Sequence, residues 1–187
     1  PHHSIAGQIN KLLAAGFKVA ICDQIEDPKL AKGLVKRAVT RILSPGVVYD
    51  PDTLDSLSAN YLASFDENAL SFLDASTGEA FYFRVRSPAS RDRLLASLQP
   101  VEVVLSQTQG ETARDYVLAL APHATISVHE PERGASYPGR LEDAPSSSRR
   151  IFDYARRMQG DGVSSQILEF EQREVQDRLE LGPTVLR

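Results

Sequence analysis

The sequence predicts an α/β protein in which a partial mixed α/β segment precedes a mixed sheet flanked by helices. Tight turns at residues 66–68 and 75–78 separate three runs of alternating apolar residues, which predicts three antiparallel strands. The run Val101–Leu105 reads as apolar on both faces, which is typical of a strand inside a covered sheet. Helical patterns follow the third and later strands, so we expect helices on the faces of the sheet.

The first 45 residues predict a helix and two strands. Ser4 is a candidate N-cap, and Gly16 supplies the C-terminal stop. The apolar stripe of this helix is formed by Ile5, Ile9, Leu12 and Leu13. Strands are expected at 17–22, where Phe17 is interpreted as a core residue, and at 38–44. The turn pair Pro45-Gly46 ends the segment, and residues 46–58 read as a linker.

The next hundred residues predict the element order β-β-β-α-β-α-β-α. The expected strands are Tyr61–Phe65, Leu70–Asp74, Phe81–Val85, Val101–Leu105 and Thr125–Val128. Ser87 caps a helix with Pro88 at its first position, and Ser146–Ser148 are expected to cap the last helix. Apolar faces are expected at Leu94, Leu95 and Leu98, at Ala113, Tyr116, Val117 and Leu120, and at Ile151, Ala155 and Met158. A strand-like stretch, Ile167–Glu171, follows.

Composition restricts the class of protein. Hydrophobic residues make up 42% and charged residues 25% of the 187 positions, which is ordinary globular composition. No apolar run reaches the roughly 18 residues needed to cross a bilayer, so we expect no membrane association. The single cysteine, Cys22, excludes an internal disulfide, suits the cytoplasm and is interpreted as a small buried strand residue.

Charge is unevenly distributed along the chain. Residues 1–45 carry seven Lys or Arg against three Asp or Glu, whereas residues 46–145 carry seven against fifteen, and residues 146–187 carry seven of each. The basic end suits an anionic partner, and the acidic middle would be repelled by nucleic acid.

A basic cluster follows the first predicted strand. Lys29, Lys32, Lys36 and Arg37 stand at i, i+3, i+7 and i+8, so a helical segment would place all four on one face. Such a face can meet a phosphate backbone, although a solvated surface is the alternative interpretation.

The order of residues around this cluster resembles a sequence motif of a known protein family. The run VAICDQIEDPKLAKGLVKRAVTRILSPG at 19–46 is similar to the end of the mismatch-binding domain of the MutS family of bacterial DNA mismatch repair proteins. NYLA at 60–63, LDASTGE at 73–79 and PVEVVLS at 100–106 are similar to the connector domain of that family. The passage 182–187 resembles the start of the family's lever helices, although Gly182 stands where the family usually has Asp.

The resemblance implies a division of the chain. Residues 1–45 would end the mismatch-binding domain, 46–59 would be a linker, 60–159 a ribonuclease-H-like connector domain, and 160–187 the start of the helical lever/core domain. The chain opens at Pro1 without a methionine and stops at Arg187, so we expect a piece of a longer protein.

The resemblance also implies function. The parent protein would be a homodimeric, cytoplasmic, DNA-dependent ATPase that recognises mispaired or looped-out bases in duplex DNA and recruits MutL. This piece would relay conformational change and dock MutL. The expected DNA-contacting residues are His3, Lys32, Lys36 and Arg37, with two exposed histidines at the chain end as the alternative for His3.

No ATP site is expected in this chain. The sequence contains no G-x-x-x-x-G-K-[ST], so ATP and Mg²⁺ are implied only for the full-length protein, and no cofactor or metal is expected here. The phenylalanine and glutamate with which the family reads a mispaired base would lie upstream of Pro1.

Two other classes of protein are alternatives, a nuclease and a protein-interaction module. A stand-alone ribonuclease-H-like nuclease needs carboxylates inside the first strand and at the end of the fourth, where this sequence has Leu62-Ala63-Ser64 and Val104-Leu105-Ser106. Asp66 and Asp74 are interpreted as solvated turn residues, and His123 and His129 as surface residues. We therefore predict no enzymatic activity for this chain, and a pure protein-interaction module remains an alternative.

Overall fold

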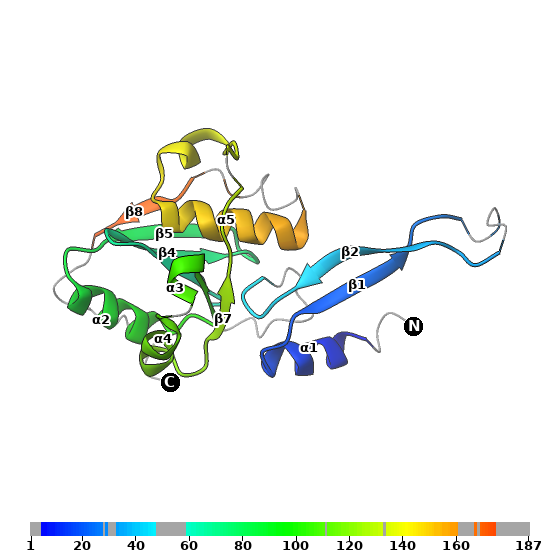
Figure 1. Cartoon of the computed structure of the whole chain (residues 1–187), viewed down its shortest axis with the longest axis horizontal. Coiled ribbons are helices and arrows are strands. Elements are labelled where there is room, and N and C mark those ends of the chain that lie inside the picture. Colours follow the sequence, from blue (N-terminus) through cyan, green and yellow to red (C-terminus); the bar gives the residue numbers. More distant parts are fainter. Residues whose placement is uncertain are drawn as a thin grey trace.

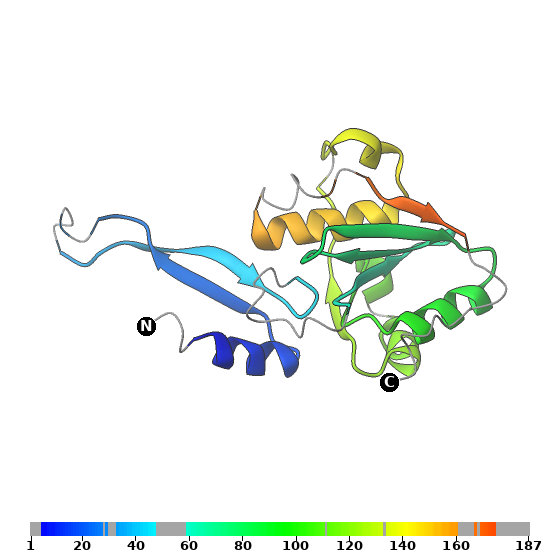
Figure 2. The ribbon, with the colours of Figure 1, turned by 180° about the vertical axis from the view of Figure 1, so that it is seen from behind.

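A two-stranded hairpin extends from a helix-covered sheet, as Figures 1 and 2 show from opposite sides. The computed structural model describes residues 5–27, 29, 33–47, 59–110, 112–132, 134–160, 167 and 169–174. The hairpin and one helix come from the first 43 residues. The sheet and the remaining helices come from residue 62 onward and are called the body below.

The body is built on one mixed sheet. Its strands are β3 (Leu62–Phe65), β4 (Ala69–Asp74), β5 (Glu79–Arg84), β6 (Glu102–Leu105), β7 (Thr125–Val128) and β8 (Glu171–Arg173). The spatial order is β7-β6-β3-β4-β5-β8. The β3–β4 and β4–β5 pairs are antiparallel, and the β3–β6, β6–β7 and β5–β8 pairs are parallel. The predicted fold class is confirmed for the mixed sheet flanked by helices, whereas residues 175–187, most of the predicted start of a helical domain, lie outside the described residues.

Helices cover both faces of this sheet. Helices α2 (Pro88–Leu98) and α4 (Arg114–Leu120) pack on one face, and α5 (Ser146–Gln159) packs on the other. Two short helices, α3 (Gln107–Gly110) and the 3₁₀ helix η2 (Gly139–Asp143), were not predicted. The Ser87 cap of α2 is confirmed, since its side chain accepts a hydrogen bond from the Ser90 amide at 3.3 Å.

The two faces of the sheet differ in chemistry. The α2/α4 face is aromatic, because Phe72 and Phe81 stack at 5.4 Å between ring centroids and Tyr61 meets both rings edge-on. The centre of the α5 face is polar instead. The Ser71 hydroxyl bonds the hydroxyls of Ser147 and Ser148 at 2.8 Å each. Small hydroxyl side chains leave room for α5 to lie close to β4.

The first turn of α5 is capped from outside the helix. Pro145 occupies the N-cap position and provides no side-chain hydrogen bond, so the predicted serine cap is wrong. The carboxylate of Asp66, between β3 and β4, instead accepts from the Ser147 amide at 3.0 Å and the Ser146 hydroxyl at 2.9 Å. Burial opposes ionisation of Asp66, but hydrogen bonds from Ser147, Asn68 and Ser146 outweigh it and lower its pKa.

Asp74 is also not the solvated turn residue that was expected. It is buried, and its carboxylate accepts hydrogen bonds from the Asn60 amide at 3.1 Å and from the amide and hydroxyl of Ser76 at 2.9 and 2.6 Å. The β4–β5 turn therefore uses this acid as a structural acceptor.

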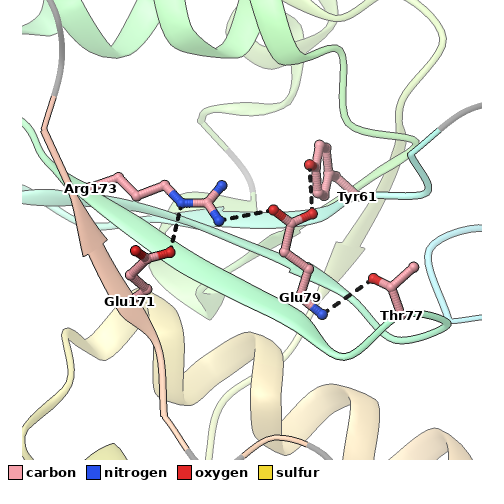
Figure 3. A network of polar contacts seen from close by, with 5 residues as sticks. All are labelled: Tyr61, Thr77, Glu79, Glu171 and Arg173. Carbon is pink, nitrogen blue, oxygen red and sulfur yellow. Dashed lines mark hydrogen bonds and ion pairs between the residues drawn. The ribbon is translucent and has the colours of Figure 1, made fainter.

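The last described strand joins the sheet at its edge. Figure 3 shows Arg173 on β8 bridging Glu171 and Glu79, with both N···O distances at 2.9 Å, while Tyr61 donates to Glu79 at 2.9 Å. The Arg173 guanidinium also lies 3.8 Å from the centroid of the Phe81 ring. Burial and the neighbouring Glu79 raise the pKa of Tyr61 to about 12. The strand was expected at Ile167–Glu171 and begins where that range ends.

The first 43 residues form α1 (Ala6–Ala14), β1 (Val19–Gln24) and β2 (Arg37–Leu43). Gly16 ends the first helix as predicted. Its φ is +82°, its amide donates to the Leu13 carbonyl at 2.8 Å, and the Phe17 amide donates to the Leu12 carbonyl at 3.0 Å. The predicted N-cap, Ser4, lies outside the described residues.

Two residues of this segment are more exposed than the sequence pattern indicated. Phe17 is 60% exposed, so its assignment to the core is wrong. Cys22 is exposed as well, because the face of β1 that carries it has nothing packed against it in the described chain. Among the described residues, no helix has the length and apolarity needed to cross a membrane.

Candidate nucleic-acid interface

The two strands of the hairpin are held in one register by backbone pairing. β1 and β2 are antiparallel from Val19 opposite Leu43 to Gln24 opposite Arg37. The ladder continues beyond the strands, since the Ile25 amide donates to the Lys36 carbonyl at 3.1 Å. In both views, the connection between the strands lies at the end farthest from the sheet. The basic cluster therefore lies toward the free end of a projecting arm.

A β-bulge modifies the middle of the arm. Thr40 is the extra residue, because Ile21 pairs with Arg41 while Cys22 pairs with Val39. The Thr40 hydroxyl donates to the carboxylate of Asp23 at 2.6 Å. Bulges bend the strand that carries them and increase its twist, so the distal half is turned relative to the base of the arm.

Lys36 and Arg37 present their charges to solvent. Both side chains are exposed, and the ion pairs found among the described residues involve neither of them. Arg37 opens β2, and residues 33–36 before it are not helical. The expectation that a helical face gathers the bases is therefore wrong in this part of the cluster, which leads directly into a strand.

The acids near these bases are engaged with the backbone. The Glu26 carboxylate accepts a hydrogen bond from the Lys36 amide at 2.8 Å, and the Asp27 carboxylate accepts one from the Lys29 amide at 2.9 Å. These bonds fix the shape of the connection, while the ammonium groups of both lysines remain exposed.

The other two expected DNA-contacting residues, His3 and Lys32, lie outside the described residues. The structure therefore brings together only Lys36 and Arg37 of the four. The same end of the arm also exposes apolar side chains, with Leu34 at 99% and Ile25 at 58% exposure. The major groove of B-DNA admits a two-stranded β-ribbon, so a hairpin of this kind is a candidate for contact with DNA.

The body contains a buried pair of side chains that the sequence pattern does not indicate. His129 is 8% exposed, and its Nε2 lies 2.9 Å from a carboxylate oxygen of Asp153 on α5, so its assignment to the surface is wrong. Arg156 donates to the other oxygen of Asp153 at 2.7 Å. The partners are 24 residues apart, so no local spacing indicated the pair.

A second missed group surrounds Glu102 on β6. Its side chain is 0% exposed and accepts hydrogen bonds from Ser127 of β7 and Tyr154 of α5. The interpretation of Val101–Leu105 as apolar on both faces is therefore wrong at Glu102. This acid was the available signal, because an unpaired carboxylate is not tolerated in an apolar core.

The centre of the sheet carries a cation where a nuclease would gather acids. Arg150 of α5 is 7% exposed and donates to the Ser64 hydroxyl of β3 at 2.9 Å. Burial lowers its pKa. Across the described ranges, no group of three or more His, Cys, Asp or Glu is arranged to hold a metal ion.

The chain is similar in sequence to known proteins of one family. The family profile described as MutS domain I matches residues 1–52. A DNA mismatch repair protein MutS of Fusobacterium nucleatum is 37% identical over 123 residues, covering 63% of this chain and 14% of that protein. Those of Syntrophobacter fumaroxidans and Listeria innocua are 42% and 41% identical, covering 65% and 70% of this chain and 15% and 16% of the relatives.

The chain belongs to the MutS family. It is a segment of a DNA mismatch repair protein and spans roughly one seventh of the length of the curated relatives that it matches. In this MutS-family chain, the profile match covers α1, the hairpin and the Ser44–Val47 turn.

Proposed function

We propose that this MutS-family segment contacts duplex DNA through its β1–β2 hairpin and transmits the resulting displacement to the body. The observation that carries this proposal is the projecting arm with two exposed cations, Lys36 and Arg37, that have no carboxylate partner among the described residues. Lysine and arginine side chains bind phosphates by releasing condensed counterions, so such an arm suits the DNA backbone. His3 and Lys32 are proposed as additional contacts.

The proposal includes the domain division given by the resemblance. Residues 1–45 end the mismatch-binding domain, 46–59 connect it, 60–159 form the connector domain, and 160–187 begin the lever/core domain. The pairing of β8 with β5 supports extending the connector domain to include Glu171–Arg173.

The activities of the whole protein are proposed from the family resemblance of the sequence. They comprise recognition of mispaired or looped-out bases, regulation by ATP and Mg²⁺, homodimer formation, recruitment of MutL and action in the cytoplasm. In this segment, the body would serve as relay and as docking face for MutL. A pull-down with MutL using only residues 60–158 separates the docking role from DNA binding.

The DNA-contact proposal predicts a salt-dependent loss on neutralising the arm. We expect the double substitution Lys36→Ala, Arg37→Ala to weaken binding to a fluorescent duplex and to reduce the slope of log K against log salt by about two, one per phosphate contact. Fluorescence anisotropy across a salt series measures both quantities.

The matched control replaces two exposed arginines of the body with alanine, Arg93 on α2 and Arg157 on α5. If the control lowers affinity and slope as much as the arm variant does, the arm is not the contact surface.

We further expect weak binding without mismatch preference and no ATP hydrolysis. A nanomolar preference of this chain for a G·T duplex would contradict that expectation.

The nuclease alternative has its own test. Mg²⁺-dependent cleavage that disappears in Asp66→Asn or Asp74→Asn would favour it. The arrangement of the side chains supports the opposite expectation, because both acids are occupied as backbone acceptors and the Arg150 guanidinium lies against Ser64 of the central strand.

A further inference from the structure

The turn that follows the hairpin is built into the body. Ser44 and Val47 form an isolated β-bridge, closed by a hydrogen bond of 3.0 Å from the Val47 amide to the Ser44 carbonyl. Both residues are 0% exposed, and Val47 packs in the core cluster that includes Leu62 of β3 and Ile151 of α5. The base of the arm is therefore part of the core.

Glu102 is the centre of the polar contacts at this turn. Its carboxyl group accepts from the Gly46 amide at 2.9 Å, the Ser127 hydroxyl at 2.5 Å and the Tyr154 hydroxyl at 2.6 Å. The three donors come from the turn, from β7 and from α5. Burial and the adjacent Glu102 raise the pKa of Tyr154, which keeps its hydroxyl proton available to donate.

Gly46 packs tightly against Glu102. A Cβ atom at this position would lie 3.0 Å from the Cβ of Glu102 and 3.0 Å from Cδ1 of Leu62. Both neighbours are fully buried, so neither has room to move away from an added methyl group. The close approach of the turn to β6 therefore accommodates glycine, and any larger residue here would have to displace Glu102 and Leu62.

Further contacts converge on the same place. The Asn60 side chain donates to the Pro45 carbonyl at 3.0 Å, and Gln159 of α5 donates to the Val47 carbonyl at 3.2 Å. The ammonium of Lys18, just before β1, lies 5.1 Å from the centroid of the Tyr154 ring. Tyr154 thus contacts both Glu102 and the residue that precedes the first strand of the arm.

We infer that Glu102 is a positioning residue, which together with Gly46 locks the orientation of the β1–β2 arm on the sheet. Any displacement of the arm is then passed to the body through the contacts of this turn, in which the buried carboxyl group of Glu102 joins β6 to β7 and α5. This inference deepens the proposed function, because it names the contact that carries motion from the DNA-contacting arm into the body. The arm is expected to keep this orientation whether or not DNA is bound.

Pulsed electron paramagnetic resonance on the full chain tests the lock. One spin label is attached to the single cysteine, Cys22, which is exposed on β1, and the other to Ser97→Cys, an exposed position on α2. We expect a single narrow distance distribution in the otherwise unchanged chain. Gly46→Ala and Glu102→Ala should each widen or shift it, with the width growing about twofold.

The matched control is Glu79→Ala, which breaks the polar network at the opposite edge of the sheet and should leave the distribution unchanged. Thermal unfolding by circular dichroism checks that the body remains folded. Where Glu102→Ala fails to fold, Gly46→Ala is the deciding variant, because it alters the turn and removes no side chain of the body.

Two results would overturn the inference. One is a broad distribution in the unchanged chain, and the other is a narrow, unshifted distribution in a folded Gly46→Ala chain. DNA binding by the same samples, measured by fluorescence anisotropy, distinguishes the proposed DNA contact from the proposed lock. An ordered arm that does not bind DNA contradicts only the proposed function, whereas a disordered arm that binds DNA contradicts only the lock.

Discussion

Asp66 is a single carboxylate that connects a strand turn with a helix from a distant part of the chain. One oxygen accepts from the amides of Asn68 and Ala69 within its own turn, at 2.9 and 2.8 Å. The other accepts from Ser146 and Ser147 at the start of α5. The acid thus replaces the N-cap side chain that Pro145 cannot provide, and its negative charge lies at the positive end of the helix dipole.

Replacing Asp66 with Asn should lower stability in a pH-dependent way. The pKa of folded Asp66 lies below its usual value of 3.8, so ionised Asp66 stabilises the folded chain above that pH, and the contribution is lost as pH falls through the folded pKa. We expect a loss of about 1 kcal/mol at neutral pH, as for other helix caps. Urea unfolding at several pH values measures it, and the difference between the two chains should shrink in acid.

Asp115→Asn is the control for this substitution. It removes an exposed acid from the first turn of α4, where no side-chain cap is formed. Only the smaller dipole contribution of about 0.3 kcal/mol should be lost there. Equal losses in both variants at neutral pH would show that the hydrogen bonds to Asp66 contribute nothing of their own.

At the scale of elements, β8 is attached to β5 by backbone pairing, by a hydrogen bond from Tyr82 to Gln172, and by the side chain of Arg173. It contributes only Glu171–Arg173 to the sheet edge, and two of these residues are exposed. Arg173 joins the strand to Glu79 and lies on the Phe81 ring, so it combines a charge-assisted hydrogen bond with a cation–π contact. A short edge strand with so few buried residues is expected to open more readily than the central strands.

Substituting Arg173 should release this strand. We expect Arg173→Ala to lower the free energy of unfolding by about 1 kcal/mol and to speed amide hydrogen exchange at the β5–β8 edge. Arg173→Lys should restore only part of the protection, because an ammonium lacks the planar fork that bonds Glu79 and Glu171 together. Exchange at the β3–β6 pair serves as internal reference. Full protection at β8 in the alanine variant would contradict the prediction.

At the scale of the whole molecule, the arm and the body differ in how they are stabilised. The body has two hydrophobic cores, one on each face of its sheet. The described part of the arm has two paired strands and exposes Ile25, Leu34 and Val39. A two-stranded sheet with so little burial is marginal in water, so the arm depends on its attachment to the body.

Truncation should separate the two parts. We expect a chain of residues 44–174 to unfold cooperatively on heating, because it retains both cores and the Ser44–Val47 turn. A peptide of residues 1–43 should show no cooperative transition by circular dichroism. Cooperative melting of the peptide, or its absence in the longer chain, would refute this division.

The sequence by itself determined the local elements of this protein. Alternating apolar residues, the Ser87-Pro88 start and the Gly16 stop act over a few residues, and the elements that they predict are present. The resemblance of residues 19–46 predicted the family, since a long ungapped motif carries more information than composition. These features depend on neighbours in the chain, so they can be recognised without the fold.

Only the tertiary structure decided which polar residues are buried and with whom. Asp66, Glu102 and His129 each find partners at least 24 residues away, and no periodicity encodes such pairs. The same holds for Cys22 and Phe17, which are apolar yet exposed because burial depends on what packs against a face. Local propensity selects strands and helices, whereas desolvation of a carboxylate is compensated only by donors that folding brings together.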